Sequence, residues 1–401
     1  MADNKKVKKA VKKLAKSKYF GFLILIVIIM IVAFALYCYF NPEMYNAIRN
    51  LLGDSEPIKP KQNVIKYYTS PYVVDSDDEL DDLTIHMVDV GQGDSFIIEL
   101  PDGANVLIDA GKSSESDQVL TYAQNLGITV FDVVIITHSD EDHIGGIDEI
   151  FEAFEVKNCY RPYVYYSGDA YEIDPEINEG ASTKTHGTNA YGKVLQSISN
   201  ETYKEGNQTY YCTWEYFNKS SSFGRDIVVG NKTYNYNFDF LTPTSNLENI
   251  NYKDLNDFSP YILFTYGLKG ESEGDSRFDM LFTGDAEKVA LNELLLEYDG
   301  KNYDVDVLKV GHHGSNTSTT RDFLNFITPE YAMISCGLDN HYDHPHQQIL
   351  DLFIEDSITF YRTDLHGDVY ITINENGNYD FHYEKSPSNS EINVGGNPSN
   401  N

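Results

Sequence analysis

Short apolar runs separated by polar turns recur along the chain from residue 83 to residue 384. Apolar and polar positions alternate within most runs, and Gly, Asp or Asn residues lie between them, a pattern that predicts β-strands joined by tight turns. Helical periodicity appears at 120–128 and at about 146–154. We expect strands in 83–90, 94–100, 104–111 and 131–139, strand–helix alternation through 261–267, 278–298, 305–315, 320–327 and 331–337, and a final hairpin in 369–384. Alternating strands and helices predict an α/β fold.

The first 40 residues have a different pattern. Residues 1–18 hold eight lysines and one acidic residue, whereas residues 19–40 hold no charged residue. A helix of that length spans about 33 Å, which is enough to cross a bilayer core. Aromatic residues at both ends of the run are typical of the membrane interface. We therefore predict a single transmembrane helix at 19–40, preceded by a basic tail.

The distribution of lysines also predicts an orientation. Positively charged segments next to a membrane helix stay in the cytoplasm, so we expect residues 1–18 inside the cell and the rest of the chain outside, anchored in the cell membrane. A cleaved signal peptide is the main alternative, and a buried helix of a soluble protein is another. The signal peptide is disfavoured because its apolar region is usually shorter and precedes a small-residue cleavage site. Here bulky residues follow, YCYFNPEMYN.

Composition changes divide the remainder. Residues 41–82 are polar and acidic and predict a linker, and residues 83–385 predict one domain. Within that domain, residues 165–235 are rich in Tyr, Asn, Ser and Thr, have weak periodicity, and are interpreted as an insertion. Residues 386–401 predict a disordered tail. Four cysteines without a CxxC pair support neither a disulfide framework nor a thiolate zinc site.

The charge balance excludes two classes of protein. The chain has 62 acidic and 30 basic residues, a net charge of −32, with 41% hydrophobic and 13% aromatic residues. Wholesale disorder is excluded by this apolar content, and a basic protein that coats nucleic acid is excluded by the charge. Residues 41–401 alone carry 22 basic and 61 acidic residues, a formal charge of −39. An anionic substrate would therefore need local neutralisation.

The segment with the strongest chemical signal follows the predicted strand at 131–139. It places two imidazoles and two carboxylates in one short loop, at His138, Asp140, Asp142 and His143. Imidazole and carboxylate together suit zinc, manganese or iron. A solvated acidic loop with incidental histidines is the alternative interpretation of this segment taken alone.

Three further strand ends carry the same residue types. Asp109, Asp285 and the pair His312-His313 each follow an apolar run. A single Asp after a strand is commonly only a helix N-cap, but the recurrence indicates a site, because α/β folds assemble their sites where strands end. Two bridged metal ions at such a place would activate water at neutral pH and stabilise charge on the attacked atom.

These residues resemble the metallo-β-lactamase superfamily, and within it most closely the metallohydrolase domain of ComEC-type competence proteins. The resemblance covers about residues 83–380 without the insertion. It implies a four-layer αββα sandwich. The motifs that carry it are the turn Asp89-Val90-Gly91-Gln92-Gly93-Asp94, Asp109, the HxDxDH loop His138 to His143, Gly284-Asp285, His312-His313-Gly314-Ser315 and Tyr342-Asp343-His344-Pro345-His346.

The resemblance also implies roles for individual residues. It implies two divalent ions, zinc or manganese, with His138 and Asp140 mainly at one, Asp142, His143 and either His312 or His313 at the other, and Asp285 between them. His312 is slightly favoured over His313. Asp142 and His344 are the expected catalytic residues, with His344 as a proton donor or phosphate contact. Second-shell or substrate-contacting roles are expected for Asp109, Asn256, Asp257, Ser259 and Ser315.

Two positions depart from the family pattern. Asp343 stands where the family usually has Gly, which affects the conformation of that loop. The histidine of the superfamily's third motif is missing, and Asn256-Asp257-Phe258-Ser259 occupies the corresponding place. The resemblance therefore implies that one metal site is weaker or is filled only with substrate bound.

The implied activity is hydrolysis of an anionic phosphodiester, DNA among the candidates, by a membrane-anchored extracellular enzyme without a nucleotide cofactor. The chain has one predicted membrane helix and is not itself expected to be a channel, so a membrane channel is an expected partner. Two alternatives stay open. One is a hydrolase of the same fold that acts on another ester, lactone, thioester, β-lactam or cell-wall phosphoester, and the other is a non-catalytic surface binding module.

Overall fold

The computed structural model describes residues 67–68, 70–74, 80–178, 182–270 and 277–396. By its contacts the chain divides into two compact units, residues 59–204 with 210–401, and residues 1–58 with 205–209; the first of these is described below. Among the described residues, no helix has the length and apolar character needed to cross a bilayer. The predicted basic tail and transmembrane helix lie outside the described residues.

One sheet of eight strands runs from the predicted linker to the last third of the chain. The order is β1 (Tyr72–Val74), β14 (Ser222–Val229), β15 (Lys232–Phe240), β16 (Ile262–Leu268), β17 (Arg277–Phe282), β18 (Val307–Lys309), β19 (Tyr331–Ile334) and β20 (Thr359–Arg362). Neighbouring strands from β14 to β17 pair antiparallel, and neighbouring strands from β17 to β20 pair parallel.

A second sheet of eight strands combines the start and the end of the domain. Its order is β13 (Thr213–Tyr216), β8 (Asn158–Arg161), β6 (Val133–Ile135), β4 (Asn105–Ile108), β3 (Phe96–Glu99), β2 (Leu83–Met87), β21 (Val369–Ile373) and β22 (Tyr379–Tyr383). The strands β21 and β22 form the hairpin predicted around Asn376-Gly377. Strand pairs β5 (Val130–Phe131) with β7 (Glu155–Val156), β9 (Val164–Tyr165) with β10 (Ser182–His186), and β11 (Thr202–Glu205) with β12 (Gln208–Tyr211) complete the strands.

The two sheets bury a common core between them. In β15, Tyr234, Tyr236, Phe238 and Phe240 are buried while the residues between them are partly exposed. Side chains alternate across a strand, so these four face the opposite sheet and meet the inward side chains of β2, β3, β4 and β6. Alternate residues of the second sheet's strands, such as Leu107, face the other side of the sheet and belong to a separate hydrophobic cluster. Each sheet therefore has two buried faces.

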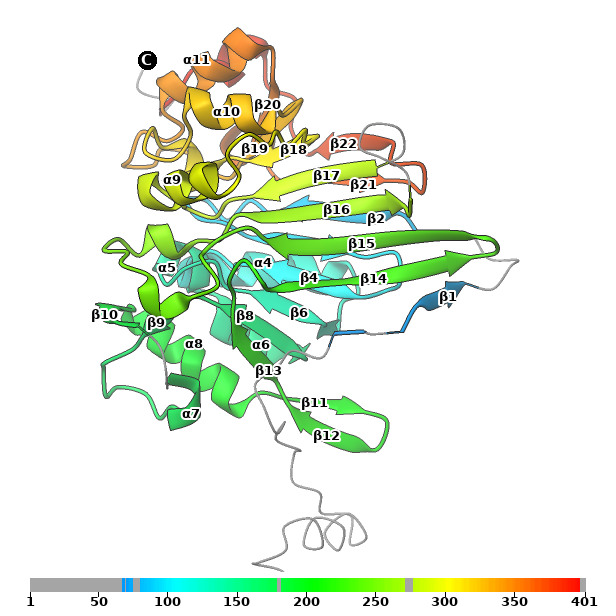
Figure 1. Ribbon diagram of the computed structural model, residues 1–401. Helices are drawn as coiled ribbons and strands as arrows, with labels where there is room; N and C mark the ends of the chain where they lie inside the picture. Colours follow the sequence, from blue (N-terminus) through cyan, green and yellow to red (C-terminus); the bar gives the residue numbers. More distant parts are fainter. Residues whose placement is uncertain (1–66, 69, 75–79, 179–181, 271–276, 397–401) are drawn as a thin grey trace, which may run out of the picture. The chain divides into compact units, whose positions relative to one another are not determined.

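Helices cover both outer faces. The second sheet packs against α4 (Ser116–Asn125), α6 (Ile147–Ala153) and α8 (Asn189–Asn200), and the first against α9 (Lys288–Glu297), α10 (Arg321–Ile327) and α11 (Gln347–Asp356). Figure 1 shows α9, α10 and α11 beside β17–β20. Short helices are α5 (Glu141–Ile144), α7 (Pro175–Asn178), α12 (Thr363–His366), α13 (Asn389–Ile392) and the 3-10 turns η1 (Ser113–Glu115), η2 (Leu247–Asn249), η3 (Asn256–Phe258) and η4 (Gly311–Gly314). The layers are helix, sheet, sheet, helix, as the resemblance implied.

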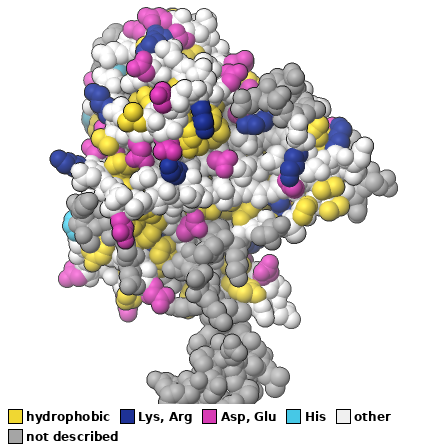
Figure 2. Space-filling view, in the orientation of Figure 1, with side chains coloured by type: hydrophobic (Ala, Val, Ile, Leu, Met, Phe, Trp, Pro, Cys, Tyr) yellow, Lys and Arg dark blue, Asp and Glu magenta, His cyan; other side chains and the backbone are white. Residues whose placement is uncertain are grey.

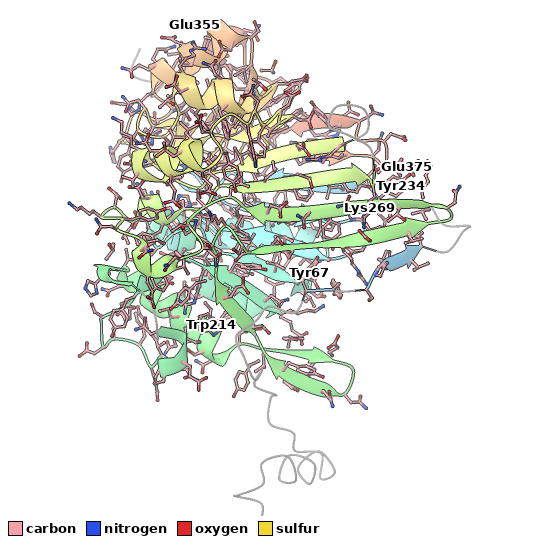
Figure 3. The ribbon with its side chains drawn as sticks, viewed as in Figure 1. Tyr67, Trp214, Tyr234, Lys269, Glu355 and Glu375 are labelled. Atoms are coloured by element: carbon pink, nitrogen blue, oxygen red, sulfur yellow. The ribbon has the colours of Figure 1, made fainter. Side chains whose placement is uncertain are left out.

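Segments interpreted as appendages contribute to these sheets. From 165–235 come α8, β13 and β14, and β14 pairs along its whole length with β15. The described end of the predicted linker also packs on the first sheet: β1 pairs with β14, and the ring of Tyr67 lies 5.0 Å from that of Phe223 (Figure 3). Composition alone does not reveal that these segments add strands to the sheets.

The described part of the predicted tail differs from the expectation of disorder. Arg362 donates from Nη1 to the carbonyl oxygens of Ile392 (3.0 Å) and Val394 (2.6 Å). The backbone N–H of Gly395 donates to Gln347 Oε1 (2.8 Å), and that of Gly396 donates to the Pro345 carbonyl (2.8 Å). These contacts use main-chain atoms, so a polar, small-residue composition does not prevent order here.

Candidate metal centre

Strands of both sheets deliver side chains to one site. In the second sheet, β4 ends before Asp109 and β6 ends before the loop that holds His138 to His143. In the first sheet, β17 ends before Asp285, and β18 ends at Lys309, just before His312 and His313. Contacts such as His143 Nε2 to Asp285 Oδ1, 3.2 Å, join the two sets. The site therefore lies where the sandwich brings the carboxyl ends of both sheets together.

Four buried side chains form the densest group of possible ligands. One donor atom from each of Asp94, His143, Asp285 and His313 lies within 4.8 Å of the others. The Nε2 atoms of the two histidines are 3.3 Å apart, and His313 Nε2 is 3.3 Å from Asp285 Oδ2. Donors bound to one tetrahedral zinc ion at 2.0–2.1 Å would be about 3.4 Å apart. The spacing of these three residues therefore fits a shared metal ion.

Both histidines of this group have a polar partner at Nδ1, the ring nitrogen opposite Nε2. His143 Nδ1 is 2.7 Å from Asp109 Oδ2, and His313 Nδ1 is 2.9 Å from the Ser335 carbonyl. An imidazole that donates from Nδ1 keeps the lone pair of Nε2 free for a metal, and such supporting acceptors fix the ring of a ligating histidine. Thr137 donates from its backbone N (2.9 Å) and its hydroxyl (2.6 Å) to Asp109. Asp109 therefore contacts His143 on the ring nitrogen opposite Nε2, and its supporting role stays a prediction.

The remaining donors of the HxDxDH loop lie beside this group. Asp142 Oδ2 is 3.5 Å from His313 Nε2, and His138 Nε2 is 3.8 Å from Asp140 Oδ2. Burial, and after it the neighbouring His143, lowers the pKa of His138 to about 3, so its imidazole is neutral. Burial and the nearby Asp142 raise the pKa of the Asp140 carboxyl to about 6. Neutral imidazole and a crowded carboxylate pair are the forms that bind a divalent cation.

Three atoms of the candidate ligands lack a hydrogen-bond partner among the described residues. They are Asp94 Oδ1, His138 Nε2 and Asp285 Oδ1, all buried. Buried polar atoms are rarely left unpaired because each costs free energy. Although burial opposes ionisation of Asp285, the adjacent His143 and His313 hold its pKa well below the ordinary value. Buried acceptor atoms that the protein leaves unsatisfied fit coordination to a metal ion.

The comparisons with known proteins agree with this geometry. A family model described as the metallo-β-lactamase superfamily matches residues 88–196. ComE operon protein 3 of Bacillus subtilis is 28% identical over 302 residues, which are 71% of this chain and 32% of that protein. Competence protein ComA of Neisseria gonorrhoeae is 25% identical (75% and 34% covered), and Recombination protein 2 of Haemophilus influenzae is 29% identical (67% and 26% covered).

These matches support a ComEC-type member of the metallo-β-lactamase superfamily, in agreement with the motifs. The chain spans about a third of the length of the first two relatives. Family and donor group together support a metal-dependent hydrolase.

The family's HHGS motif offers two histidines, and only one lies in the donor group. His313 contacts Asp142 and Asp285 through Nε2. His312 Nε2 is farther from Asp285, at 3.7 Å, and its Nδ1 lies 3.0 Å from Glu287 Oε1 at the partly exposed rim. The distances favour His313 as a ligand over His312, the reverse of the slight preference from sequence. Spacing along the chain did not separate them, because both residues adopt the left-handed conformation (φ 48° and 54°) and this turn decides which ring points inward.

His344 lies on the same rim. Its ring centroid is 5.4 Å from that of His312, and Gln92 Nε2 is 3.4 Å from its Nδ1. The Gln92 amide is oriented by its other end, since Oε1 accepts from the Gly337 N–H (3.1 Å). The preceding Asp343 has φ 57°, a conformation that Asp adopts more readily than most residues. Asp in place of the family's usual Gly is therefore compatible with the turn that presents His344.

The residues at the family's third motif separate into different roles. Ser259 Oγ accepts from the Asp285 N–H (3.1 Å), so it positions that carboxylate. Asp257 Oδ1 accepts from the N–H groups of Val289 and Ala290 (both 3.1 Å) at the start of α9, away from the donor group. The backbone N–H of Asn256 donates to Asp254, and among the described residues no hydrogen bond or ion pair joins Asn256 to the donors. Ser315, near the rim, bonds to the Thr317 hydroxyl (2.9 Å).

Sequence reasoning missed two buried members of the site. Asp94 was quoted as the last residue of the Asp89–Asp94 turn, without a role, and Lys309 was not singled out. Lys309 Nζ contacts Asp94 Oδ2 and lies 3.8 Å from Asp285 Oδ1. A signal for Lys309 was present, because it ends an otherwise apolar strand, Val307–Lys309, just before the HHGS motif.

Proposed function

We propose that the chain is a membrane-anchored, extracellular metal-dependent phosphodiesterase that uses a dinuclear site, with DNA as its candidate substrate. The observation that carries the proposal is the two-sided donor set around Asp285. His143 lies 3.2 Å from Oδ1 of Asp285 and His313 lies 3.3 Å from Oδ2. Asp142, His138 and Asp140 supply the other donors of the loop. Two divalent ions held this way would lower the pKa of bound water and stabilise charge on the attacked phosphorus.

The protein's own groups would orient the substrate and the donors. Asp109 and Ser335 hold the ligating rings, and Ser259 holds Asp285. Because Gln92 Nε2 donates to His344 Nδ1, the proton of the neutral His344 ring lies on Nε2. Burial, followed by His313 and His312, lowers the pKa of His344 to about 3. In this state His344 would donate a hydrogen bond to a phosphate oxygen, which favours the phosphate-contact role for it.

The relatives support a phosphodiester, and DNA in particular, as the substrate. Two of them are named as competence proteins or operon products and one as a recombination protein. The chain matches only about a third of the first two, so their complete activities are not transferred by similarity. Participation in DNA uptake beside a membrane channel is the part of this proposal that rests on the relatives alone.

The charge of the chain bears on how a nucleic acid would be held. The net charge is −32, and on the face seen in Figure 2 the Lys and Arg side chains of the described residues lie apart from one another. Strong DNA binding depends on many lysine and arginine contacts with phosphates. Contact with a polyanion would therefore be confined to the metal centre and its histidine rim, with weak binding elsewhere.

The test of phosphodiester hydrolysis uses the purified full-length chain with bis(p-nitrophenyl) phosphate and added Mn²⁺ or Zn²⁺. We expect turnover that EDTA abolishes. Asp142→Ala and Asp285→Ala should each remove it, whereas Asp117→Ala, an exposed position on α4, should not. Activity retained in both site variants would exclude the dinuclear mechanism.

A substrate panel separates the alternatives. Cleavage of single- or double-stranded DNA would support the nuclease, and its salt dependence should be shallow because few phosphates are contacted. Turnover of a lactone, thioester, β-lactam or other phosphoester without DNA cleavage would support a different hydrolase of this fold. A folded chain that binds no divalent ion would support the non-catalytic binding module.

Membrane anchoring through residues 19–40 has its own test. Protease added to intact cells that express the chain should digest residues 83–385 and leave an N-terminal fragment in the membrane. Release of the intact domain into the medium would instead indicate a cleaved signal peptide. Protection of the domain until the cells are opened would contradict the proposed orientation.

A further inference from the structure

A cavity lies beside the final hairpin, and its lining shares no residue with the donor group of the metal centre. Its volume of about 510 Å³ is in the range of sites for small molecules. The lining includes Tyr122 from α4, Asp368 and Tyr370 at the start of β21, and His382, Tyr383 and Glu384 at the end of β22. Among the described residues, neither a lysine nor an arginine lines this hairpin cavity. Its chemistry is therefore aromatic and acidic.

Three rings form a row across the outer face of the second sheet at this cavity. His86 in β2, Tyr370 in β21 and His382 in β22 lie directly opposite one another in the strand register. The rings of Tyr370 and His382 are stacked, with centroids 4.5 Å apart, and both residues are partly exposed. Tyr122 contacts the other end of the row, 5.4 Å from His86. The face of a tyrosine ring carries partial negative charge and attracts cations.

Two carboxylates of the hairpin cavity lack a cationic partner. Among the described residues, no ion pair joins Asp368 or Glu384 to a basic side chain, and the exposed Lys385 lies outside the lining. Asp368 Oδ1 accepts from the Asp89 N–H (2.7 Å), and Glu384 lies against Gly367, where a Cβ would collide with its Oε2. Burial raises the pKa of the Asp368 carboxyl, and Glu384 raises it further against the hydrogen bond from Asp89. A cation between these two carboxylates would relieve their repulsion.

The hydroxyl of Tyr122 is oriented as an acceptor for the cavity. His86 Nε2 lies 2.9 Å from Glu99 Oε2, and His86 Nδ1 lies 3.0 Å from the Tyr122 hydroxyl. Because a carboxylate accepts hydrogen bonds, Nε2 carries the proton, and in the neutral ring Nδ1 accepts from Tyr122. Burial raises the pKa of Tyr122 and the nearby Asp368 raises it further, so the hydroxyl stays protonated. Its oxygen therefore keeps its lone pairs for a donor in the cavity.

We propose that the hairpin cavity binds a small alkylammonium ion, with the ammonium at the Asp368 and Glu384 carboxylates and the alkyl chain against the tyrosine rings. Neutral and anionic ligands would leave the two carboxylates without a counter-charge. A divalent metal ion takes a shell of oxygen ligands, which aromatic rings cannot supply. An alkylammonium ion matches both parts of the lining, because it carries N–H donors at one end and apolar surface at the other.

The test measures binding of n-butylammonium to the purified full-length chain by titration followed by NMR. We expect saturable binding with a Kd of about 1 mM or tighter, which a ligand of this size can reach. The neutral analogue 1-butanol has nearly the same shape and should bind at least about tenfold more weakly, because it loses the charged hydrogen bonds. Potassium chloride at the same concentration should not displace n-butylammonium.

Variants that keep the shape of the cavity separate its charge from its rings. Glu384→Gln and Asp368→Asn should each weaken n-butylammonium binding about tenfold, and the Asn oxygen can still accept from the Asp89 N–H. Glu375→Gln is the matched control, since Glu375 is an exposed acid in the turn of the same hairpin, outside the lining (Figure 3). It should bind n-butylammonium as the wild type does. Glu384 is exposed, so Glu384→Gln carries the test if Asp368→Asn does not fold.

Four results would overturn the proposal. They are the absence of saturable n-butylammonium binding, equal affinity for 1-butanol, displacement by potassium chloride at equal concentration, and an unchanged affinity in Glu384→Gln. The measurement uses neither a metal ion nor turnover. Absent phosphodiesterase activity would therefore refute the proposed function without affecting this site.

Discussion

Replacing Asp109 with Asn tests how the metal centre depends on a residue that does not bind metal. The Asp109 carboxylate accepts from His143 Nδ1 (2.7 Å) and from both the N–H and the hydroxyl of Thr137. The new amide has one acceptor oxygen and one donor nitrogen. If the oxygen keeps the Thr137 N–H, the NH₂ group faces His143 Nδ1, which must then become the acceptor. The proton moves to Nε2 and blocks the lone pair that would bind metal.

The size of the effect follows from that change. Loss of a supporting partner of a metal-bound histidine typically costs 10–100-fold in metal affinity or activity, or about 1.4–2.7 kcal/mol. The upper part of that range is expected here, because Asp109 is fully buried and water has no access to replace it. We therefore expect Mn²⁺ affinity to fall by about two orders of magnitude, with phosphodiesterase activity falling in parallel at subsaturating metal.

Calorimetric Mn²⁺ titration of the full-length chain measures the loss, and Asp257→Asn is its control. Asp257 is another buried aspartate that accepts backbone N–H groups, but at the start of α9 and with no histidine neighbour. Asn caps helices about as well as Asp, so this variant should keep the wild-type affinity. An Asp109→Asn chain that folds and binds Mn²⁺ as tightly as the wild type would refute the argument that Asp109 sets the proton position on His143.

Three further predictions concern the surroundings of the centre. Thr188 caps α8 and donates from Oγ1 to the Ser139 carbonyl (2.6 Å) in the loop that holds His138 to His143. Thr188→Val should lower the unfolding free energy by about 1 kcal/mol and reduce turnover, whereas Thr188→Ser should keep the wild-type stability and turnover. Deleting residues 394–401 removes the main-chain bonds to Arg362 and to the segment before α11, so it should lower Tm and kcat, whereas deleting 397–401 should lower neither. Burial raises the pKa of Glu201 from 4.5 to about 7, although the hydrogen bond from the Val156 N–H opposes this shift. The folded state should therefore lose stability as the pH rises from 4.5 to about 7. Urea midpoints at pH 5 and pH 8 should differ less in Glu201→Gln than in the wild type, and equal differences would contradict this.

The sequence predicted the parts of the fold and site that depend on local patterns. Alternating runs marked the strands, and ligand-type residues at strand ends marked the centre, because side-chain direction and strand termini are local properties. The choice of His313 over His312 depended on a left-handed turn, and the Lys309–Asp94 pair joins residues from two different sheets. The left-handed turn has no local sequence signal, and the polar end of the strand Val307–Lys309 marks Lys309 without identifying its partner.

Composition is a poor guide to segments that are ordered by backbone hydrogen bonds or by one buried face of a strand. In Lys232–Phe240, buried aromatic residues alternate with Asn and Asp, so a segment that looked polar forms the centre of a sheet. Residues up to Gly396 are held through carbonyl and N–H groups, which every sequence has. The predicted transmembrane helix lies outside the described residues and stays a prediction.

The origin of the metal donors in two sheets has a consequence for biogenesis. His143 and His313 touch although 170 residues separate them in the chain, so the centre forms only when both sheets have closed on each other. A chain that has not yet been synthesised or exported as far as residue 285 holds none of the donors from the first sheet. If the protein is a nuclease and its domain is exported as proposed, its activity would appear only after the complete domain has folded outside the cell, away from the cell's own DNA.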